Sequence, residues 1–220
     1  MSGLFVTFEG VEGAGKTTQI RLLRQTLEAE GRNVCVTREP GGDALAEGIR
    51  NLLLHVAMTP RAELLLFLAS RAQNVEAVIR PHLAAGGVVL CDRYIDSSVA
   101  YQGYARGLGR DNAAHLNTFA THGLMPDLTF LLDLAPEVGL ARQQERNRME
   151  SESLEFHRRV REGYLAEAQN NASRFCILDA ALPPDALQTL ILTRTQAALQ
   201  HISDAQAGIL LQRGEYTIAT

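Results

Sequence analysis

A glycine-rich stretch near the N-terminus constrains the fold more than any other part of this chain. Residues 4–8, Leu-Phe-Val-Thr-Phe, form a short apolar, β-branched and aromatic run that is typical of a buried strand. Residues 10–17 then fit the pattern G-x-x-x-x-G-K-[ST], and residues 17–30 follow with apolar side chains at helical spacing. Strand, glycine loop and helix in this order are the context that identifies a phosphate-binding P-loop.

The chemistry of such a loop is the capture of an anion. Glycines allow successive backbone N–H groups to point inward around a phosphate, and the N-terminus of the following helix adds partial positive charge. Lys16 is expected to reach the outer phosphates, and the Thr17 hydroxyl is expected to ligate Mg²⁺. The predicted nucleotide-binding residues are Gly10, Val11, Glu12, Gly13, Ala14, Gly15, Lys16, Thr17 and Thr18.

Lys16 is also the only lysine in the chain, because the other twenty of the 21 basic residues are arginines. A bias in composition explains arginine at the surface, but it makes the one retained lysine informative. A compact ammonium on a flexible stem acts as a point charge on phosphate, which a planar guanidinium does not reproduce. Lys16 is therefore a predicted catalytic residue.

Composition limits the remaining possibilities. A length of 220 residues predicts one domain or at most two, and a net charge of −4 gives no basic surface for nucleic acid. The three cysteines lie in apolar runs without metal-ligand spacing, which is typical of reduced core cysteines in a cytoplasmic protein. We find no signal peptide and no uninterrupted apolar stretch of about 18 residues, so we expect no membrane span.

Short apolar strands alternate with helical segments along the chain. The expected strands are residues 4–8, 33–37, 88–91, 127–134 and 174–179. The expected helices after the first are residues 45–54, 60–80, 95–105, 111–122, 136–146, 154–169 and 183–200. This alternation predicts an α/β fold with a five-stranded parallel sheet and helices on both faces. Pro81 is expected to end the helix over 60–80, and the extension over 201–220, beyond a single domain of residues 1–200, has no assignable pattern.

Asp92 and Arg93 follow directly after the apolar strand over residues 88–91. In a parallel sheet, ligands bind at the carboxyl ends of the strands. Asp92 can hold a Mg²⁺-bound water there, and Arg93 adds a fixed cation for a second phosphate group. The alternative is that Asp92 caps a helix and Arg93 is its surface partner, but a P-loop in the same chain favours the functional interpretation.

Phe67 and Arg71 are four residues apart on the helix expected after Pro60, so they share one face. A ring beside a guanidinium suits a flat heteroaromatic ligand, because the ring can stack while the arginine donates to an exocyclic oxygen. Leucines surround Phe67, however, so from these residues alone a core phenylalanine is the favoured interpretation.

Arg142, Arg146 and Arg148 lie next to a polar interruption over residues 147–153. Arginines on a mobile segment can close over a transferring phosphoryl group and stabilise its charge. From these residues alone, a solvated charged face is the favoured interpretation. Glu12 is different, because a carboxylate inside a phosphate-binding loop is electrostatically costly, and this position predicts a role through Mg²⁺, water or a sugar hydroxyl.

Taken together, these motifs resemble the thymidylate kinase family, which transfers the γ-phosphoryl group of ATP to dTMP. The resemblance extends from residue 4 to about residue 180, and its most specific part is the segment from Asp92 to Gln102. The other matching motifs are residues 9–18, residues 38–42 (Arg-Glu-Pro-Gly-Gly), residues 126–129 (Pro-Asp-Leu-Thr), and Glu152-Ser153 with Phe156.

The resemblance implies a role for each matching residue that would contact the nucleoside of dTMP. Phe67 would stack on thymine, and Arg71 would bond its exocyclic oxygen. Ser98 and Gln102 would line the base pocket. Tyr101 would pack against the deoxyribose, where a 2′-hydroxyl would lie.

The resemblance also implies how charge is supplied to the phosphates. Arg93 would hold the phosphate of dTMP, and Arg146 and Arg148 would belong to a mobile lid, about residues 142–153, over ATP. One branch of the family carries an arginine in the P-loop itself. Gly13 occupies that position here, so the lid would supply the cation, as in the bacterial type.

The family further implies ATP as phosphoryl donor, Mg²⁺, a homodimer, a cytoplasmic location and a step in dTTP synthesis. Two alternatives remain open from the residues. One is a kinase for another pyrimidine nucleotide or nucleoside, which base-edge contacts from Arg71 and Gln102 would decide. The other is a P-loop switch that binds partners according to its nucleotide state, against which the acceptor-like group of Phe67, Arg71 and Arg93 argues.

Overall fold

The computed structural model describes residues 3–142 and 147–213, with side chains up to residue 205. Its centre is a sheet in the order β2-β3-β1-β4-β5, in which every neighbouring pair of strands is parallel. The strands are β1 (Leu4–Glu9), β2 (Val34–Arg38), β3 (Val88–Asp92), β4 (Leu128–Asp133) and β5 (Phe175–Asp179). The predicted five-stranded parallel sheet of an α/β fold is confirmed.

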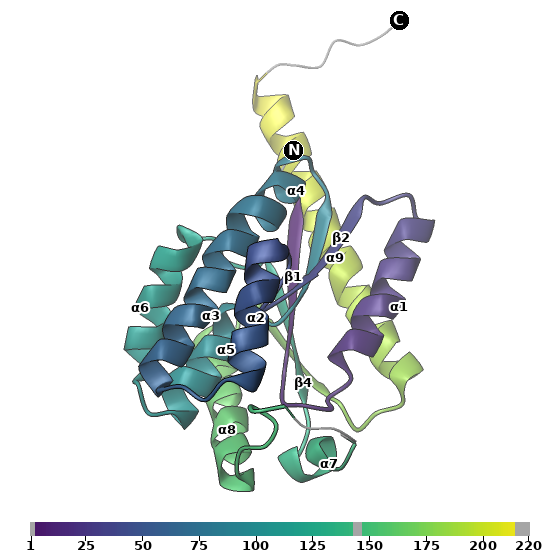
Figure 1. The fold of residues 1–220 in the computed structure, drawn as a ribbon. Coiled ribbons are helices and arrows are strands. Elements are labelled where there is room, and N and C mark those ends of the chain that lie inside the picture. The colour runs from purple at the N-terminus through teal and green to yellow at the C-terminus, as the bar shows by residue number, and fades with distance from the viewer. Residues whose placement is uncertain (1–2, 143–146, 214–220) are drawn as a thin grey trace, which may run out of the picture.

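Helices cover both faces of the sheet, as predicted (Figure 1). On one face, α1 (Lys16–Ala29) packs against α9 (Pro184–Arg213). The helices gathered on the other face are α2 (Ala44–His55), α3 (Pro60–Asn74), α4 (Arg80–Ala84), α5 (Ile95–Ser98), α6 (Arg110–Thr121) and α8 (Leu154–Asn170). The short helix α7 (Pro136–Ala141) lies below the carboxyl ends of the strands in this view.

Strand β1 explains why this sheet needs two helical layers. All six of its residues are buried, and successive side chains of a strand point to opposite faces. Its even-numbered residues belong to the core that α1 and α9 share, whereas Phe5 packs with the π-helix η1 (Val75–Ile79). Glu9 follows the same alternation, so the last side chain of the strand lies on the Phe5 face.

The helix expected over residues 60–80 was predicted to end before Pro81, and this prediction is wrong. Helix α3 passes into η1 and then into α4, which begins at Arg80 and runs to Ala84. A π-turn shifts the register of the backbone hydrogen bonds, so Pro81 stands in the first turn of a new α-helix. A proline is tolerated there because the N–H it lacks would have no partner within the helix.

The C-terminal helix is longer than predicted, since α9 continues past residue 200 to Arg213 and takes in part of the extension. The helix predicted over residues 136–146 ends as α7 at Ala141, and residues 143–146 lie outside the described residues. Within the described ranges, no helix combines the length and apolar character that a membrane crossing requires.

Candidate active site

The glycine loop lies at the centre of the carboxyl edge of the sheet, between β1 and α1. β1 has β3 on one side and β4 on the other, so the strand order reverses at this point, where open α/β sheets bind ligands. Gly10 has a φ of 138°, and a Cβ atom there would lie 2.4 Å from the carbonyl oxygen of Leu132. The loop can therefore follow this path only with glycine at its first motif position.

The Lys16 ammonium lies inside this loop. Its Nζ donates to the carbonyl oxygens of Gly10 at 3.1 Å and Val11 at 3.2 Å, and only 7% of the residue is exposed. Burial lowers the pKa of Lys16, and the charge of Arg93 lowers it further. The open cavity beside it is lined by the P-loop, Arg38, Glu39, Arg50, Asp92, Arg93, Arg142 and Glu150.

Thr17 and Asp92 meet at the edge of the same cavity. Asp92 is opposite Phe8 in the β1–β3 register, which brings the end of β3 beside the loop, and Thr17 Oγ1 donates to Asp92 Oδ2 at 3.3 Å. A hydroxyl and a carboxylate are hard oxygen ligands, and Mg²⁺ in nucleotide sites keeps several waters while taking only one or two protein ligands. The pair fits that ion, whereas the described residues contain no group of three or more His, Cys, Asp or Glu that could hold a metal.

Arg93 is held beside the loop in an uncommon backbone conformation. Its φ is 69°, a left-handed value that costs a non-glycine residue free energy and is concentrated at functional sites. Its Nη2 donates to Glu12 Oε1 at 2.5 Å, and its Nη1 donates to the Gly10 carbonyl at 3.1 Å and the Tyr164 hydroxyl at 3.0 Å. Burial acts to raise the pKa of Glu12, but the charges of Arg93 and Lys16 hold it below the usual value, so Glu12 remains ionised at neutral pH.

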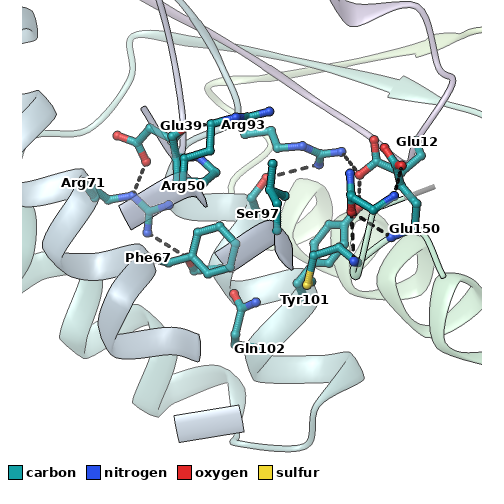
Figure 2. A pocket seen from close by; sticks show the side chains of 15 residues that line it. Glu12, Glu39, Arg50, Phe67, Arg71, Arg93, Ser97, Tyr101, Gln102 and Glu150 are labelled. Carbon is teal, nitrogen blue, oxygen red and sulfur yellow. Dashed lines mark hydrogen bonds and ion pairs between the residues drawn. The ribbon is translucent and has the colours of Figure 1, made fainter. Parts of the chain in front are cut away.

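A second cavity adjoins the first and shares lining residues with it. Figure 2 shows the side chains that line this second cavity. All four residues expected around the base line it, namely Phe67, Arg71, Ser98 and Gln102. Tyr101 lines it too and donates from its hydroxyl to Glu12 at 3.1 Å. Phe67 is only partly buried and its ring lies at the cavity, so the interpretation of Phe67 as a core residue is wrong.

Arg71 is fixed by a nearly complete set of hydrogen bonds. The residue is 1% exposed, and its Nε donates to the buried Glu39 carboxylate at 2.6 Å. Its Nη1 donates to Ser98 Oγ at 2.8 Å and to Asn117 Oδ1, and its Nη2 donates to the Tyr94 carbonyl at 2.9 Å. A guanidinium has five N–H donors, so one on Nη2 remains to meet a ligand in the cavity.

The two cavities are continuous rather than separate. The residues that line both are Glu12, Glu39, Arg50, Arg93 and Glu150. An acceptor in the second cavity can therefore place a phosphate beside the P-loop, where Arg93 and Lys16 supply positive charge. This continuity is the geometry that in-line transfer between two bound phosphates needs.

The three candidate lid arginines have separate outcomes. Arg142 Nη1 donates to the Gly13 carbonyl at 2.8 Å and lines the P-loop cavity. Arg148 does not reach that cavity, which corrects the expectation that it lies over ATP, because the buried Glu63 carboxylate binds its Nη1 at 2.6 Å and the Leu53 carbonyl binds its Nε at 2.9 Å. Arg146 lies outside the described residues.

Gly13 stands at a position without room for a side chain. A Cβ atom on Gly13 would lie 2.3 Å from the carbonyl oxygen of Gly139, and a Cβ on Gly139 would lie 2.0 Å from the carbonyl oxygen of Glu12. An arginine at Gly13 would therefore displace α7. Because Gly13 cannot carry an arginine, the positive charge for the phosphates would have to come from another residue, such as Arg142 after α7.

Sequence reasoning missed Arg50, Glu150 and Glu63. Arg50 lines both cavities and donates to the Pro40 carbonyl at 2.8 Å, but it stands on an ordinary amphipathic helix that carried no signal. Glu63 could have been found, because it lies at the same helical spacing before Phe67 as Arg71 does after it. A lone acidic residue on that face of a leucine-rich helix requires a buried partner.

Comparisons with known proteins agree with this geometry. A family model described as thymidylate kinase matches residues 8–191. A thymidylate kinase from Desulfovibrio desulfuricans is 55% identical over 195 residues, covering 83% of this chain and 90% of that protein, and one from Solidesulfovibrio magneticus is 54% identical over 197 residues, covering 84% and 94%. The crystal structure of thymidylate kinase from Ehrlichia chaffeensis superposes with a TM-score of 0.75 at 33% identity, covering 89% of this chain and all of that chain.

Proposed function

The chain belongs to the thymidylate kinase family, and from that premise we propose how its residues divide the work of the reaction. The reaction is the phosphorylation of dTMP to dTDP with ATP as the donor, a step in dTTP synthesis. The observation that carries the assignment of residues is the cavity lined by Phe67 and Arg71, which joins the P-loop cavity at Glu12 and Arg93.

The acceptor occupies the second cavity. Phe67 stacks on thymine, and the remaining Nη2 donor of Arg71 bonds its exocyclic oxygen. Ser98 contributes to the base pocket by accepting a hydrogen bond from Arg71. Gln102 lies below the Phe67 ring in Figure 2. Tyr101 packs against the deoxyribose, and Glu12, already within hydrogen-bond reach of the Tyr101 hydroxyl, accepts from the sugar hydroxyl.

Charge neutralisation supplies most of the catalysis, because phosphoryl transfer needs positioning and little covalent chemistry from the protein. Arg93 holds the dTMP phosphate, and the P-loop N–H groups with Lys16 hold the phosphates of ATP. Among the described arginines, Arg142 is best placed to stabilise the transferring group. Arg146, four residues later in the sequence, is the alternative candidate for this role. Arg148 anchors that segment through Glu63 and Leu53.

Mg²⁺ would be held at Thr17 and Asp92, the second through a bound water. Bound there, the ion would neutralise negative charge on the phosphates of the donor. The contact of 3.3 Å between the Thr17 hydroxyl and the Asp92 carboxylate supports this position, since it places two hard oxygen groups side by side at the edge of the P-loop cavity.

We also propose a homodimer and a cytoplasmic location. Leu65 on α3 is 59% exposed and Phe119 on the neighbouring α6 is 81% exposed, which suits an apolar contact between two copies of the chain. The free cysteines Cys35, Cys91 and Cys176 suit a reducing compartment that also supplies ATP. Residues 1–200 would form the catalytic unit, with the end of α9 beyond it.

One experiment tests the function directly: release of ADP from ATP, with and without dTMP. We expect release to depend on dTMP and to yield dTDP in equal amount. A nucleotide switch would hydrolyse ATP slowly whether or not dTMP is present, and a kinase for another pyrimidine would respond more strongly to another member of a nucleotide panel.

A further inference from the structure

Glu63 is a fully buried carboxylate behind the base-binding cavity. It is 0% exposed and lies on α3 one helical turn before Phe67, but it does not line the cavity itself. Its Oε1 accepts from Gln102 Nε2 at 2.9 Å and Arg106 Nε at 3.1 Å, and its Oε2 accepts from Arg106 Nη2 at 3.1 Å and Arg148 Nη1 at 2.6 Å.

These hydrogen bonds keep Glu63 ionised. Burial alone would raise its pKa, but the hydrogen bonds from Arg106, Gln102 and Arg148 outweigh burial and hold the pKa below its usual value. Arg106 also forms an ion pair with Glu152 at 2.6 Å. The cluster therefore contains two cations and two anions, and Glu63 acts in it only as an acceptor.

An acceptor at this position dictates which way the Gln102 amide points. Gln102 must present its NH₂ group to Glu63, because the reversed amide would bring two oxygens face to face in a buried site. Its Oε1 is then the free end of the amide. No residue in the described ranges donates to Oε1, and Gln102 is at the cavity, below Phe67 (Figure 2).

We propose that Glu63 is a positioning residue that fixes the Gln102 amide with its oxygen toward the base, and so selects pyrimidines that carry a proton on ring nitrogen N3. The proposal rests on the proposed use of this cavity as the base site. Thymine and uracil have an N3–H that can donate to Oε1. Cytosine has an unprotonated N3, so two acceptors would face each other with no hydrogen between them.

Glu63 also holds one wall of the cavity in place. Loss of this second role would change the kinetics in a different way from loss of the fixed amide. Arg148 is fixed by Glu63 and by the α2 carbonyls of Leu53 and Leu54, and Met149 and Glu150, which follow it, line the cavity. Loosening this wall would raise KM for every acceptor alike. Loss of the fixed amide would instead change the ratio between acceptors.

The test is the ratio of kcat/KM for dTMP to kcat/KM for dCMP in the variant Glu63→Gln. A glutamine at 63 can donate as well as accept, so the Gln102 amide is free to turn its NH₂ group toward cytosine N3. We expect the ratio to fall at least tenfold. Glu167→Gln is the matched control, because Glu167 is also buried and bound by an arginine, Arg110 at 2.8 Å, but lies away from the cavity; its ratio should stay within twofold of wild type.

A double-mutant cycle separates positioning from general damage. Gln102→Leu should lower the ratio by itself, and Glu63→Gln added to Gln102→Leu should leave the ratio unchanged, since the amide that Glu63 orients is gone. If Glu63→Gln slows both acceptors equally with an unchanged ratio, Glu63 is only structural and the proposal is wrong. If wild type does not prefer dTMP to dCMP, the base-site assignment itself fails.

Folding of the variant is checked by thermal unfolding. Glu63→Gln removes the negative charge that pairs with two arginines, so a second variant, Glu63→Gln with Arg148→Met, also removes one of these cations. The ratio in this variant should fall as in Glu63→Gln, because both lack the carboxylate beside Gln102. A ratio equal to that of wild type in the folded double variant would overturn the proposal.

Discussion

Arg93 and Glu12 form an ion pair of 2.5 Å that joins the end of β3 to the P-loop. Both side chains are mostly buried, and both residues line the P-loop cavity and the second cavity, the proposed acceptor site. A phosphate bound at Arg93 must share this guanidinium with Glu12. The pair therefore fixes the position of the cation, and we expect the affinity for a phosphate bound there to depend on both residues.

The first prediction follows from this pair. Arg93→Ala should mainly raise KM for dTMP, with a smaller effect on ATP, because it removes a cation from a buried phosphate site. The expected cost is about 2–5 kcal/mol of transition-state or binding free energy. Titration of each substrate against a fixed excess of the other measures it, with Arg24→Ala, at an exposed ion pair on α1, as the control. A defect confined to ATP would reassign Arg93 to the donor.

Lys16 gives the second prediction. Its ammonium is enclosed by the loop and donates to two loop carbonyls, so a larger planar guanidinium would neither fit nor reproduce a point charge. Lys16→Ala and Lys16→Arg should both lower kcat at least about 100-fold, the scale of losing one preorganised donor. Thermal unfolding should show an intact fold. Near-normal turnover in Lys16→Arg would contradict the assigned role.

The third prediction separates the two described lid arginines. Arg142 contacts the P-loop, so Arg142→Ala should lower kcat at least about tenfold while leaving KM for dTMP nearly unchanged, against about 10³–10⁵ for arginines that act as fingers in phosphoryl transfer. Arg148 contacts Glu63 behind the proposed base site, so Arg148→Ala should raise KM for dTMP more than it lowers kcat. Steady-state kinetics of both variants, measured together with Arg146→Ala, would separate the kcat effect from the KM effect. A KM effect in Arg142→Ala and a kcat effect in Arg148→Ala would exchange the two roles.

The sheet and the P-loop could be predicted because their signals are local. Residues 4–18 carry strand, turn and helix signals in one continuous run, and the register of β1 with β3 then brings Asp92 to Thr17. The roles of Phe67 and Arg148 could not be read in this way. Each depends on a residue distant in sequence, and helical spacing alone does not say whether an apolar face meets the core or a cavity.

The prediction that a helix ends before Pro81 was wrong for a different physical reason. Proline rules assume that an α-helix keeps one hydrogen-bond register, whereas η1 inserts a wider turn before Pro81. The segment after Asp92 behaves similarly, since the helix predicted over 95–105 is α5 followed by the π-helix η2 (Val99–Ala105). η2 places Tyr101 and Gln102 at the cavity. The sequence rules for helices do not identify a π-helix.

The fourth prediction concerns the choice between thymine and uracil. The two bases differ by one methyl group, and a methyl-sized difference in a pocket is worth about 1–3 kcal/mol. We therefore expect dUMP to remain a measurable substrate, with kcat/KM about 10- to 200-fold below that of dTMP, and dCMP to be poorer still. Competition among the monophosphates gives the order. If kcat/KM for dCMP equalled that for dUMP, Arg71 and Gln102 would not select between the bases.

The last prediction is a pH dependence of stability that arises at Glu9. Tyr94 N–H donates to its Oε1 at 2.7 Å, and the hydroxyls of Ser97 and Tyr164 donate to its Oε2 at 2.7 and 2.9 Å. Burial, and then the charge of Asp96, raises the pKa of Glu9 from 4.5 to about 7. The folded protein therefore binds a proton at Glu9 that the unfolded chain has already lost between these two pH values.

The sign follows from this difference in bound protons. The contribution of Glu9 is complete below about pH 4.5, declines as pH rises and is lost above about pH 7, with a total on the order of 3 kcal/mol. Glu9→Gln mimics the protonated acid, so the free energy of unfolding of wild type minus that of Glu9→Gln should fall by this amount from pH 4.5 to pH 8. Urea unfolding at a series of pH values measures it, with Glu162→Gln on the exposed face of α8 as a control that should show no such slope. A flat difference would mean that Glu9 is ionised in the folded protein and that Arg93, close to the Ser97 and Tyr164 hydroxyls, compensates for its burial.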